Sequence, residues 1–392
     1  MDPLPILRDL VSIPSVNPMG RDLTGPEYFE GRMSDYLVAF FQRLNVPYQR
    51  IEVSPGRANV LARIDRAGAK STIVMDAHQD TVPVEGMTIE PFTPVEKDGR
   101  LYGRGSCDVK GGMASMLAAF ARLAEERPAG MANVVMCCSC DEEQTATGAM
   151  DVAKMCSEPR AGALLTAPPD LFLVAEPTDL HIVVAHRGAV RWKLRTTGRA
   201  CHSSRPHEGV NAIYKMAQVL TCLERYASEL PQMVTPHPLC GSATFSVGRI
   251  TGGISVNTVP DECLIEIDRR VIPGEDAHAV IPHVNSYLRE RLDVDFEMLP
   301  PWLVGATLGD GNNGAWASRL MTHIDAVVGP RQKIGVPYGT NASRLVVCGA
   351  PAVVFGPGSI DQAHTKDEWI SISELRQAAD IYFRCCANEG GA

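Results

Sequence analysis

Residues 73–80 read Ile-Val-Met-Asp-Ala-His-Gln-Asp, an apolar run that ends in polar side chains. We predict a buried strand over 72–75, and similar β-branched runs recur at residues 133–138, 171–175 and 352–355. Between them, residues 110–126 carry apolar side chains at helical spacing. This alternation is typical of an α/β sheet covered by helices, whose strand ends meet at one crevice. We therefore expect functional side chains directly after the strands.

The middle of the chain has a different pattern. Residues 261–268 alternate apolar and polar side chains, as expected for a sheet with one exposed face. Helical patterns cover residues 211–228 and 276–291 among these half-polar strands. We predict a small α+β domain inserted into the larger one. The predicted bounds are 1–186 with 297–392 for the larger domain and 187–296 for the insertion.

Composition narrows the class of protein. The 392 residues are 45% hydrophobic and 21% charged, and the net charge of -9 argues against general affinity for nucleic acid or anionic lipid. The N-terminus lacks a signal-peptide pattern and no apolar run reaches eighteen residues, so we expect a cytoplasmic protein that does not enter membranes. The twelve cysteines lie mostly in apolar runs, which predicts reduced and buried thiols; for Cys137 and Cys140 a packed strand is favoured over a metal or redox site.

Two candidate metal ligands lie in the first third of the chain. His78 and Asp80 project to the same side of a strand end, and a carboxylate at this spacing can accept the second ring N–H of a metal-bound imidazole. Asp108 lies in the Gly-rich segment 103–112, where glycines permit close approach of another group. Taken alone, such a histidine is more often structural and such an aspartate is more often a helix N-cap.

Four more carboxylates and a histidine follow later strands. Asp141, Glu142 and Glu143 come directly after one apolar strand, and Glu176 ends the next. Adjacent carboxylates at a buried strand end repel one another unless a cation is present, although a solvated loop is the alternative. His364 lies in a loop rich in Gly and Pro. Together these groups suit Zn²⁺ or a similar divalent ion.

With these residues in place, the sequence resembles the M20 family of co-catalytic metallopeptidases over essentially its whole length, most closely its acetylornithine deacetylase branch. The resemblance to the family is carried by three motifs: His78-Gln-Asp80, Gly103-Arg-Gly-x-x-Asp108-x-Lys-Gly-Gly and Asp141-Glu142-Glu143. The resemblance to the branch is carried by residues 356–364 together with Tyr338-Gly-Thr340. It implies a mixed sheet flanked by helices, of the zinc-dependent exopeptidase type. It also implies that the insertion is a ferredoxin-like dimerisation and lid domain.

The resemblance assigns roles to single residues. Asp108 bridges two zinc ions, for which Co²⁺ or Mn²⁺ is an alternative, and Asp80 orients His78. Glu142 is the general base: it takes the proton of the shared water, metal-bound hydroxide attacks the amide carbonyl, and the proton passes to the leaving amine. The implied metal ligands are His78, Asp108, Glu143, Glu176 and His364.

The inserted domain carries further candidates. His202 matches a family histidine that reaches the oxyanion from the partner subunit, so the resemblance implies a homodimer. An exposed polar residue is the alternative for His202 and is favoured for the neighbouring His207. Asn257 and Arg270 resemble residues near the substrate carboxylate, which an arginine can grip bidentately. A surface salt bridge is the alternative for Arg270.

The implied reaction is hydrolysis of the amide bond of an N-acyl amino acid, as by a deacetylase in amino-acid metabolism such as arginine biosynthesis. A dipeptidase, a carboxypeptidase or a succinyl-diaminopimelate desuccinylase-like enzyme would use the same metals. A metal-free binding protein is disfavoured because the ligand set is complete and Glu142 is present. Asn341 stands where the family pattern leads us to expect Asp, so recognition of the distal end of the substrate stays open.

Overall fold

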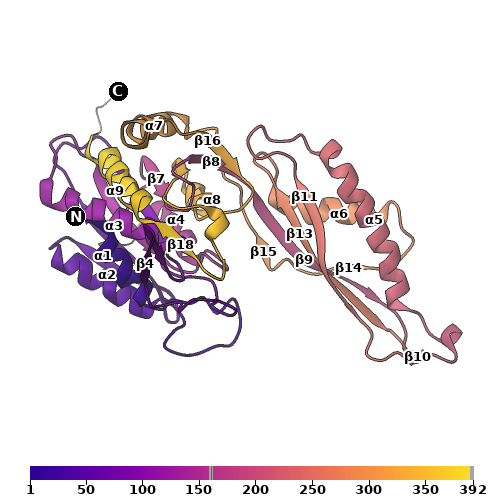
Figure 1. Cartoon of the computed structure of the whole chain (residues 1–392). Helices are drawn as coiled ribbons and strands as arrows, with labels where there is room; N and C mark the ends of the chain where they lie inside the picture. Colours follow the sequence, from indigo (N-terminus) through magenta and orange to yellow (C-terminus); the bar gives the residue numbers. More distant parts are fainter. Residues whose placement is uncertain (159, 161, 389–392) are drawn as a thin grey trace. The chain divides into compact units, whose positions relative to one another are not determined.

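The computed structural model describes residues 1–158, 160 and 162–388. The chain forms two compact units (Figure 1). Unit 1 comprises Met1–Val184, Asp310–Ile334 and the chain from Thr340 on, and unit 2 comprises Ala185–Gly309 and Gly335–Gly339. The predicted insertion, 187–296, lies inside unit 2. That unit continues to Gly309 because strands β14 (Glu297–Met298) and β15 (Leu303–Val304) pair with β9 (Gly188–Thr197).

Unit 1 is built on an eight-stranded mixed sheet with the order β1-β2-β6-β3-β7-β17-β8-β16, which confirms the predicted fold class. The four central strands β6, β3, β7 and β17 are parallel, and β1, β2 and β8 join them in antiparallel pairs. Their carboxyl ends therefore meet at one edge. The strands are β1 Tyr48–Ser54, β2 Arg57–Ile64, β3 Thr72–His78, β6 Asn133–Ser139, β7 Leu171–Val174, β8 Ile182–His186, β16 Lys333–Val336 and β17 Ala352–Val354.

Helices cover both faces of this sheet. Ile73, Met75 and Ala77 of β3 belong to one apolar core together with residues of α1, α2, α3, α7 and α9. Side chains alternate along a strand, so Asp76 and His78 face the opposite side, where α4 and α8 pack together. The helices are α1 Pro3–Ser12, α2 Gly31–Arg43, α3 Lys110–Glu126, α4 Thr147–Ser157, α7 Gly314–Val328, α8 Ala342–Leu345 and α9 Ile372–Ala387, with short 3-10 turns η3 Val346–Cys348 and η4 Ile360–Gln362.

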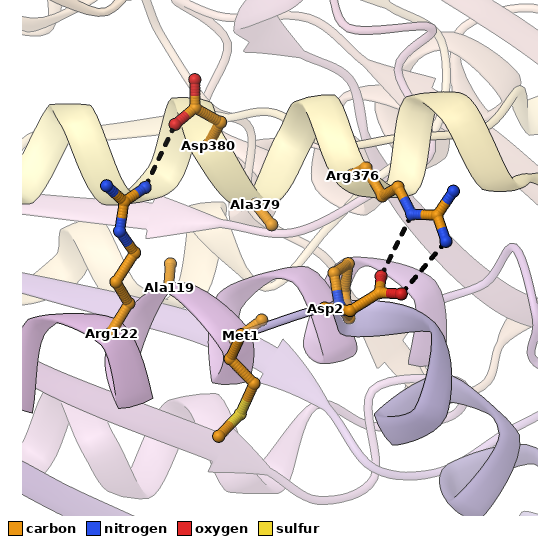
Figure 2. A pocket seen from close by; sticks show the side chains of 9 residues that line it. Met1, Asp2, Ala119, Arg122, Arg376, Ala379 and Asp380 are labelled. Carbon is orange, nitrogen blue, oxygen red and sulfur yellow. Dashed lines mark hydrogen bonds and ion pairs between the residues drawn. The ribbon is translucent and has the colours of Figure 1, made fainter. Parts of the chain in front are cut away.

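Helix α9 is fastened to the start of the chain and to α3. A shallow pocket of about 350 Å³ lies between these segments (Figure 2). At its border Arg376 donates to both oxygens of Asp2, at 3.1 and 3.0 Å, and Arg122 donates to Asp380 at 3.3 Å. Near α9, a small sheet is formed by β4 Val95–Lys97, β5 Arg100–Tyr102 and β18 Trp369–Ser371.

Unit 2 has its own sheet and its own core. The strand order is β11-β13-β9-β14, and the predicted alternation is confirmed because Cys263, Ile265 and Ile267 of β13 are buried between more exposed neighbours. Strand β9 and the helices α5 and α6 contribute further apolar residues to this core. The remaining elements are β11 Thr244–Gly252, β13 Glu262–Val271, β10 Cys201–His202, β12 Thr258–Val259, α5 Ala212–Met233, α6 Val280–Arg289, η1 Pro206–Glu208 and η2 Ala277–Ala279.

Two general properties follow from the described residues. Within them, no helix combines the length and the apolar character needed to cross a membrane. All twelve cysteines are free thiols, and ten of them are buried, as their place in apolar runs predicts.

Candidate metal centre

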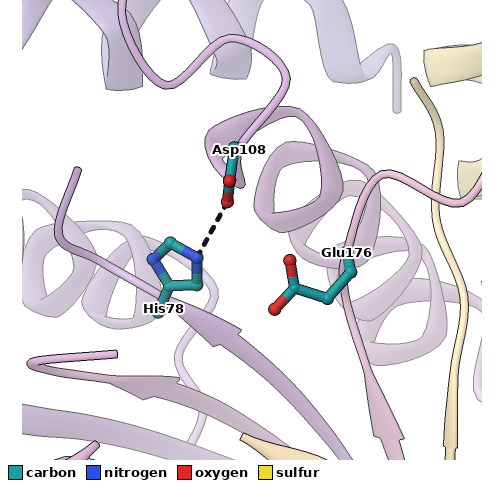
Figure 3. Close-up of side chains that lie close together, drawn as sticks. All are labelled: His78, Asp108 and Glu176. Carbon is teal, nitrogen blue, oxygen red and sulfur yellow. Dashed lines mark hydrogen bonds and ion pairs between the residues drawn. The ribbon is translucent and has the colours of Figure 1, made fainter. Parts of the chain in front are cut away.

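Three candidate ligands converge at the carboxyl edge of the unit 1 sheet (Figure 3). His78 is the last residue of β3, Asp108 lies in the turn before α3, and Glu176 follows β7. One ligand atom from each lies within 4.8 Å of the others, and all three residues are buried. His78 Nε2 is 3.1 Å from Asp108 Oδ1. Figure 3 shows the three side chains directed toward a common point.

A second group of three ligands uses the same aspartate. Asp108, Glu143 and His364 also offer atoms within 4.8 Å of one another. His364 Nε2 lies 3.3 Å from Asp108 Oδ2 and 3.3 Å from Glu143 Oε2. The two oxygens of Asp108 therefore face different histidines. This is the arrangement that a carboxylate needs in order to bridge two cations.

The electrostatics of these groups favour a bound cation. Burial, reinforced by neighbouring carboxylates, raises the pKa of Glu142 to about 8, the pKa of Glu143 to about 7 and the pKa of Glu176 well above its usual range. Hydrogen bonds that the His364 ring donates to the carboxylates of Asp108 and Glu143 raise the pKa of His364 to about 10. Several carboxylates are thus crowded into a buried site, and without a cation they retain protons. A divalent ion would relieve the repulsion between them.

One buried atom supports this interpretation directly. Among the described residues, Glu143 Oε1 is buried and has no hydrogen-bond partner, which is costly for a carboxylate oxygen unless another ligand occupies the space. The donor set consists of imidazole nitrogens and carboxylate oxygens, which Zn²⁺, Co²⁺ and Mn²⁺ accept. The residues present therefore fit a pair of divalent cations.

Glu142 and Asp80 lie beside the ligands. The carboxylate of Glu142 belongs to neither group of three, whereas its main-chain N–H donates to Asp80 Oδ1 at 3.1 Å. His78 Nδ1 is 2.9 Å from the main-chain carbonyl of Asp80 and 3.6 Å from its carboxylate. Both the carbonyl and the carboxylate of Asp80 thus lie on the side of the imidazole away from Asp108.

Glu368 is a residue that the sequence reasoning missed. Its buried carboxylate accepts the main-chain N–H groups of Gly105, Cys107 and Asp108, each at 2.9 Å, and a hydrogen bond from Arg104 Nη1 at 2.8 Å. Glu368 therefore shapes the turn that presents Asp108. The only signal in the sequence is its place four residues after His364, because its partners are remote along the chain.

Asn341 is buried under the sheet. Its Nδ2 donates to Asp76 Oδ2 at 3.1 Å and to Ser139 Oγ at 3.0 Å. Asp76 lies two residues before His78 on the same face of β3, so the amide is used inside the protein. Asp76 and Ser139 thus hold the NH₂ group of Asn341 inside unit 1.

The remaining candidates lie in unit 2. His202, on β10, is exposed and its Nδ1 is 2.8 Å from Ser204 Oγ. Asn257 lies nearby, because its carbonyl accepts the N–H of Ser203 at 3.0 Å. Arg270, on β13, donates through Nε to Asp268 at 2.8 Å. These three residues thus belong to a different unit from the two groups of ligands.

Known proteins of one peptidase family are similar to this chain over most of its length. The family model described as peptidase family M20/M25/M40 matches residues 74–388. Acetylornithine deacetylase from Vibrio campbellii is 30% identical, and the alignment covers 98% of this chain and 98% of that protein. The same enzyme from Photorhabdus laumondii is also 30% identical, over 94% of this chain and 92% of that protein.

Solved structures show the same fold. A tripeptidase from Staphylococcus aureus superposes with a TM-score of 0.77 at 21% identity, covering 98% of this chain and 97% of that one. A dinuclear metal-binding peptidase of the M20 family from Bacillus subtilis gives 0.67 at 18% identity, covering 98% and 96%. Because the family model and the relatives each span most of the sequence, this chain belongs to peptidase family M20/M25/M40.

Proposed function

We propose that the protein is a metal-dependent hydrolase that cleaves the amide bond of an N-acyl amino acid. The observation that carries the proposal is the position of Asp108, whose two oxygens face His78 and His364 from opposite groups of ligands. The similarity to acetylornithine deacetylases, at 30% identity over nearly the full length, favours an acyl amino acid as the substrate.

The proposed cofactors are two Zn²⁺ ions, with Co²⁺ or Mn²⁺ as alternatives. His78 and Glu176 would hold one ion, Glu143 and His364 the other, and Asp108 both; these five ligand residues form the two groups described above. When bound, the ions lower the pKa of a water molecule and polarise the scissile carbonyl. The crowding of carboxylates around Asp108 supports a cation at each position.

Glu142 is the proposed general base. Its carboxylate belongs to neither group of ligands, and burial raises its pKa to about 8 in the absence of a cation. A carboxylate in this place can take a proton from water and hand it to the leaving amine. Asp80 Oδ1 accepts the main-chain N–H of Glu142 at 3.1 Å. The same carboxylate lies 3.6 Å from Nδ1 of His78, on the side of the ring away from Asp108.

Unit 2 is the proposed source of the groups that bind substrate. Arg270 would grip the substrate carboxylate with the guanidinium nitrogens that Asp268 does not use, and Asn257 would add an amide. His202 would stabilise the developing oxyanion from across a homodimer interface. Its exposure on β10 leaves the ring accessible for this role.

A homodimer is proposed through the edge of the unit 2 sheet. Strand β11 ends the described strand order and is exposed along most of its length. Around its end lie apolar side chains that are largely exposed, namely Tyr214, Ile250, Ile254 and Val256. Exposed apolar residues gathered at a free strand edge are typical of a protein interface. A second copy would cover both the edge and these side chains.

The twelve free cysteines support the proposed cytoplasmic location, because thiols persist in a reducing compartment.

The test is a substrate panel with the zinc-, cobalt- and manganese-loaded protein. N-acetyl, N-succinyl and N-formyl amino acids, N-acetylornithine among them, are compared with dipeptides and with longer peptides. We expect release of the free amine from the acyl amino acids. Preferential cleavage of dipeptides would instead support a dipeptidase or carboxypeptidase, and no turnover of any compound would contradict the proposal.

A further inference from the structure

A buried hydrogen-bond network lies behind the segment that carries Glu142 and Glu143. Its members come from segments far apart in the sequence: the region before α2, the start of β2, and the loops after β3 and β6. None of them has more than a tenth of its surface exposed. The five residues are Asn17, Glu30, Arg57, Asp80 and Asp141.

Asp80 holds the main chain of both acidic residues. The N–H of Glu142 donates to Asp80 Oδ1 at 3.1 Å, and the N–H of Glu143 donates to Asp80 Oδ2 at 3.2 Å. The position of the main chain sets where each side chain begins. A movement of the Asp80 carboxylate would therefore displace Glu142 and Glu143 together.

Asn17 joins Asp80 to Asp141. Its side-chain Nδ2 donates to Asp80 Oδ2 at 2.8 Å and to Asp141 Oδ1 at 3.0 Å, which uses both hydrogens of the amide. Asp141 has a φ of 63°, which is uncommon for a residue with a side chain, and its other oxygen accepts from Thr147 at 2.8 Å. The side chain of Asp141 thus holds the turn that leads into Glu142 and Glu143.

Arg57 supplies the cation of the network. Its Nη1 donates to Asp141 Oδ1 at 2.5 Å and its Nη2 donates to Glu30 Oε1 at 2.5 Å, while a third carboxylate, that of Asp80, lies 3.9 Å away. The planar guanidinium can serve Asp141 and Glu30 at fixed angles, whereas a lysine ammonium cannot reproduce that fork. Loss of the fork would leave buried carboxylates incompletely paired.

We propose that Arg57 and Asn17 are positioning residues of the active centre, which set the place of Glu142 and Glu143 by holding Asp80 and Asp141. The inference rests on the role proposed above for Glu142. A network that served stability alone would lower the melting temperature when weakened but would leave kcat of the folded enzyme unchanged.

The test compares Arg57→Lys and Asn17→Ala with Arg63→Lys in the metal-loaded protein. Arg63 is a matched control on the same strand, β2, and donates to Asp65 and to the carbonyl of Leu164, both at 2.7 Å. At metal concentrations that keep the sites occupied, we expect kcat to fall at least about tenfold in both test variants with KM unchanged, as for other residues that orient metal-site groups. The control should keep its kcat.

Hydrogen exchange of the amides of residues 141–146 gives a second readout that needs no substrate. We expect faster exchange of the Glu142 and Glu143 amides in both test variants and no change in Arg63→Lys. Exchange and kcat equal to those of the control would overturn the inference. If the wild-type protein hydrolyses no compound of the panel, the proposed function fails, and the exchange data alone decide whether the network holds the segment. Asn17→Ala removes no charge, so it serves if Arg57→Lys does not fold.

Discussion

At the scale of single residues, Asp108 differs from the other candidate ligands because it takes part in both groups of three. His78 and Glu176 belong to one group, and Glu143 and His364 to the other. Removing a ligand that belongs to only one group leaves the other group complete. Removing Asp108 leaves two incomplete pairs.

We therefore expect Asp108→Ala to bind neither ion, whereas His364→Ala retains one. Metal content after exhaustive dialysis, measured by plasma mass spectrometry, distinguishes the two results. Asp367→Ala, which changes an exposed residue of the His364 loop, is the control and should keep both ions. Retention of two ions by Asp108→Ala would show that the aspartate is not shared.

A substitution of Glu142 should change the activity of the protein and not its metal content. Glu142→Ala should abolish hydrolysis and leave the metal content unchanged, because this carboxylate is outside both groups of ligands. Activity and metal are measured on the same preparation, with the exposed Glu126→Ala as the control. If metal is lost together with activity, Glu142 is a ligand.

Glu368 is expected to act on metal affinity through the turn that holds Asp108. In Glu368→Gln one acceptor oxygen becomes an NH₂ group that faces main-chain N–H donors, so the turn is distorted. We expect a loss of about 10- to 100-fold in metal affinity, measured by competition with a chelator. Glu374→Gln, in which the carboxylate accepts the N–H of Gly358 at 2.8 Å, is the matched control. Equal affinities would contradict the prediction.

At the scale of elements, α9 is attached to unit 1 by two kinds of contact. On its buried side Tyr382 is fully enclosed, its hydroxyl donates to the carbonyl of Phe355 at 2.5 Å, and its ring meets that of Phe355 edge to face at 5.4 Å. On its outer side Arg376 pairs with Asp2 across the rim of the pocket in Figure 2.

These contacts are expected to differ in energy. Tyr382→Phe leaves a buried carbonyl without its donor and should lower the free energy of unfolding by about 1–3 kcal/mol. Arg376→Ala breaks a half-exposed ion pair and should cost less than about 1 kcal/mol. Urea unfolding of the metal-free variants measures both values. Equal losses would show that the ion pair contributes as much as the buried hydrogen bond.

The elements were predictable where the signal is local. Helix α3 has the bounds 110–126 that its apolar spacing predicts. Helix α5 runs past the predicted end at residue 228 to Met233, through Pro231, because the buried Leu230 keeps its last turn packed. The segment predicted as a helix from residue 276 begins as the 3-10 turn η2, and its α-helical part, α6, covers Val280–Arg289.

In the candidate site, too, the residues with a local sequence signal were predictable and those with only remote partners were not. His78, Glu143 and Glu176 end apolar strands or follow them, so the parallel order of those strands gathers them at one edge, and the sequence predicted this. Arg57 and Glu368 were missed because they act on partners far away in the sequence and occupy no motif. Hydrogen bonds of this kind become visible only when the topology is known.

At the scale of the whole molecule, the two units have separate cores, and the five candidate metal ligands belong to unit 1. Unit 2 carries the free edge of β11 and the exposed apolar side chains proposed as a dimer interface. We therefore expect substitutions in unit 2 to alter the proposed assembly without changing metal binding, and substitutions of the candidate ligands to do the reverse.

We expect Ile254→Asp combined with Val256→Asp to give a folded monomer, because buried charges would oppose the proposed interface. Light scattering coupled to size-exclusion chromatography measures the mass, and metal content shows that unit 1 is intact. Val347→Asp, which changes an exposed apolar residue of unit 1, should leave the mass unchanged. If hydrolysis persists in the monomer, His202 does not act across the interface.

The long stretch of sequence between His364 and the other candidate ligands has a consequence for biosynthesis. His78, Asp108 and Glu176 leave the ribosome long before the segment that contains His364, and that segment also supplies Glu368 to the turn of Asp108. A nascent chain that has not yet reached this segment thus lacks both one candidate ligand and the group that shapes the shared one. We therefore expect the two-ion centre to be completed only after residues 364–368 have left the ribosome, and not while the strands of unit 1 are being synthesised.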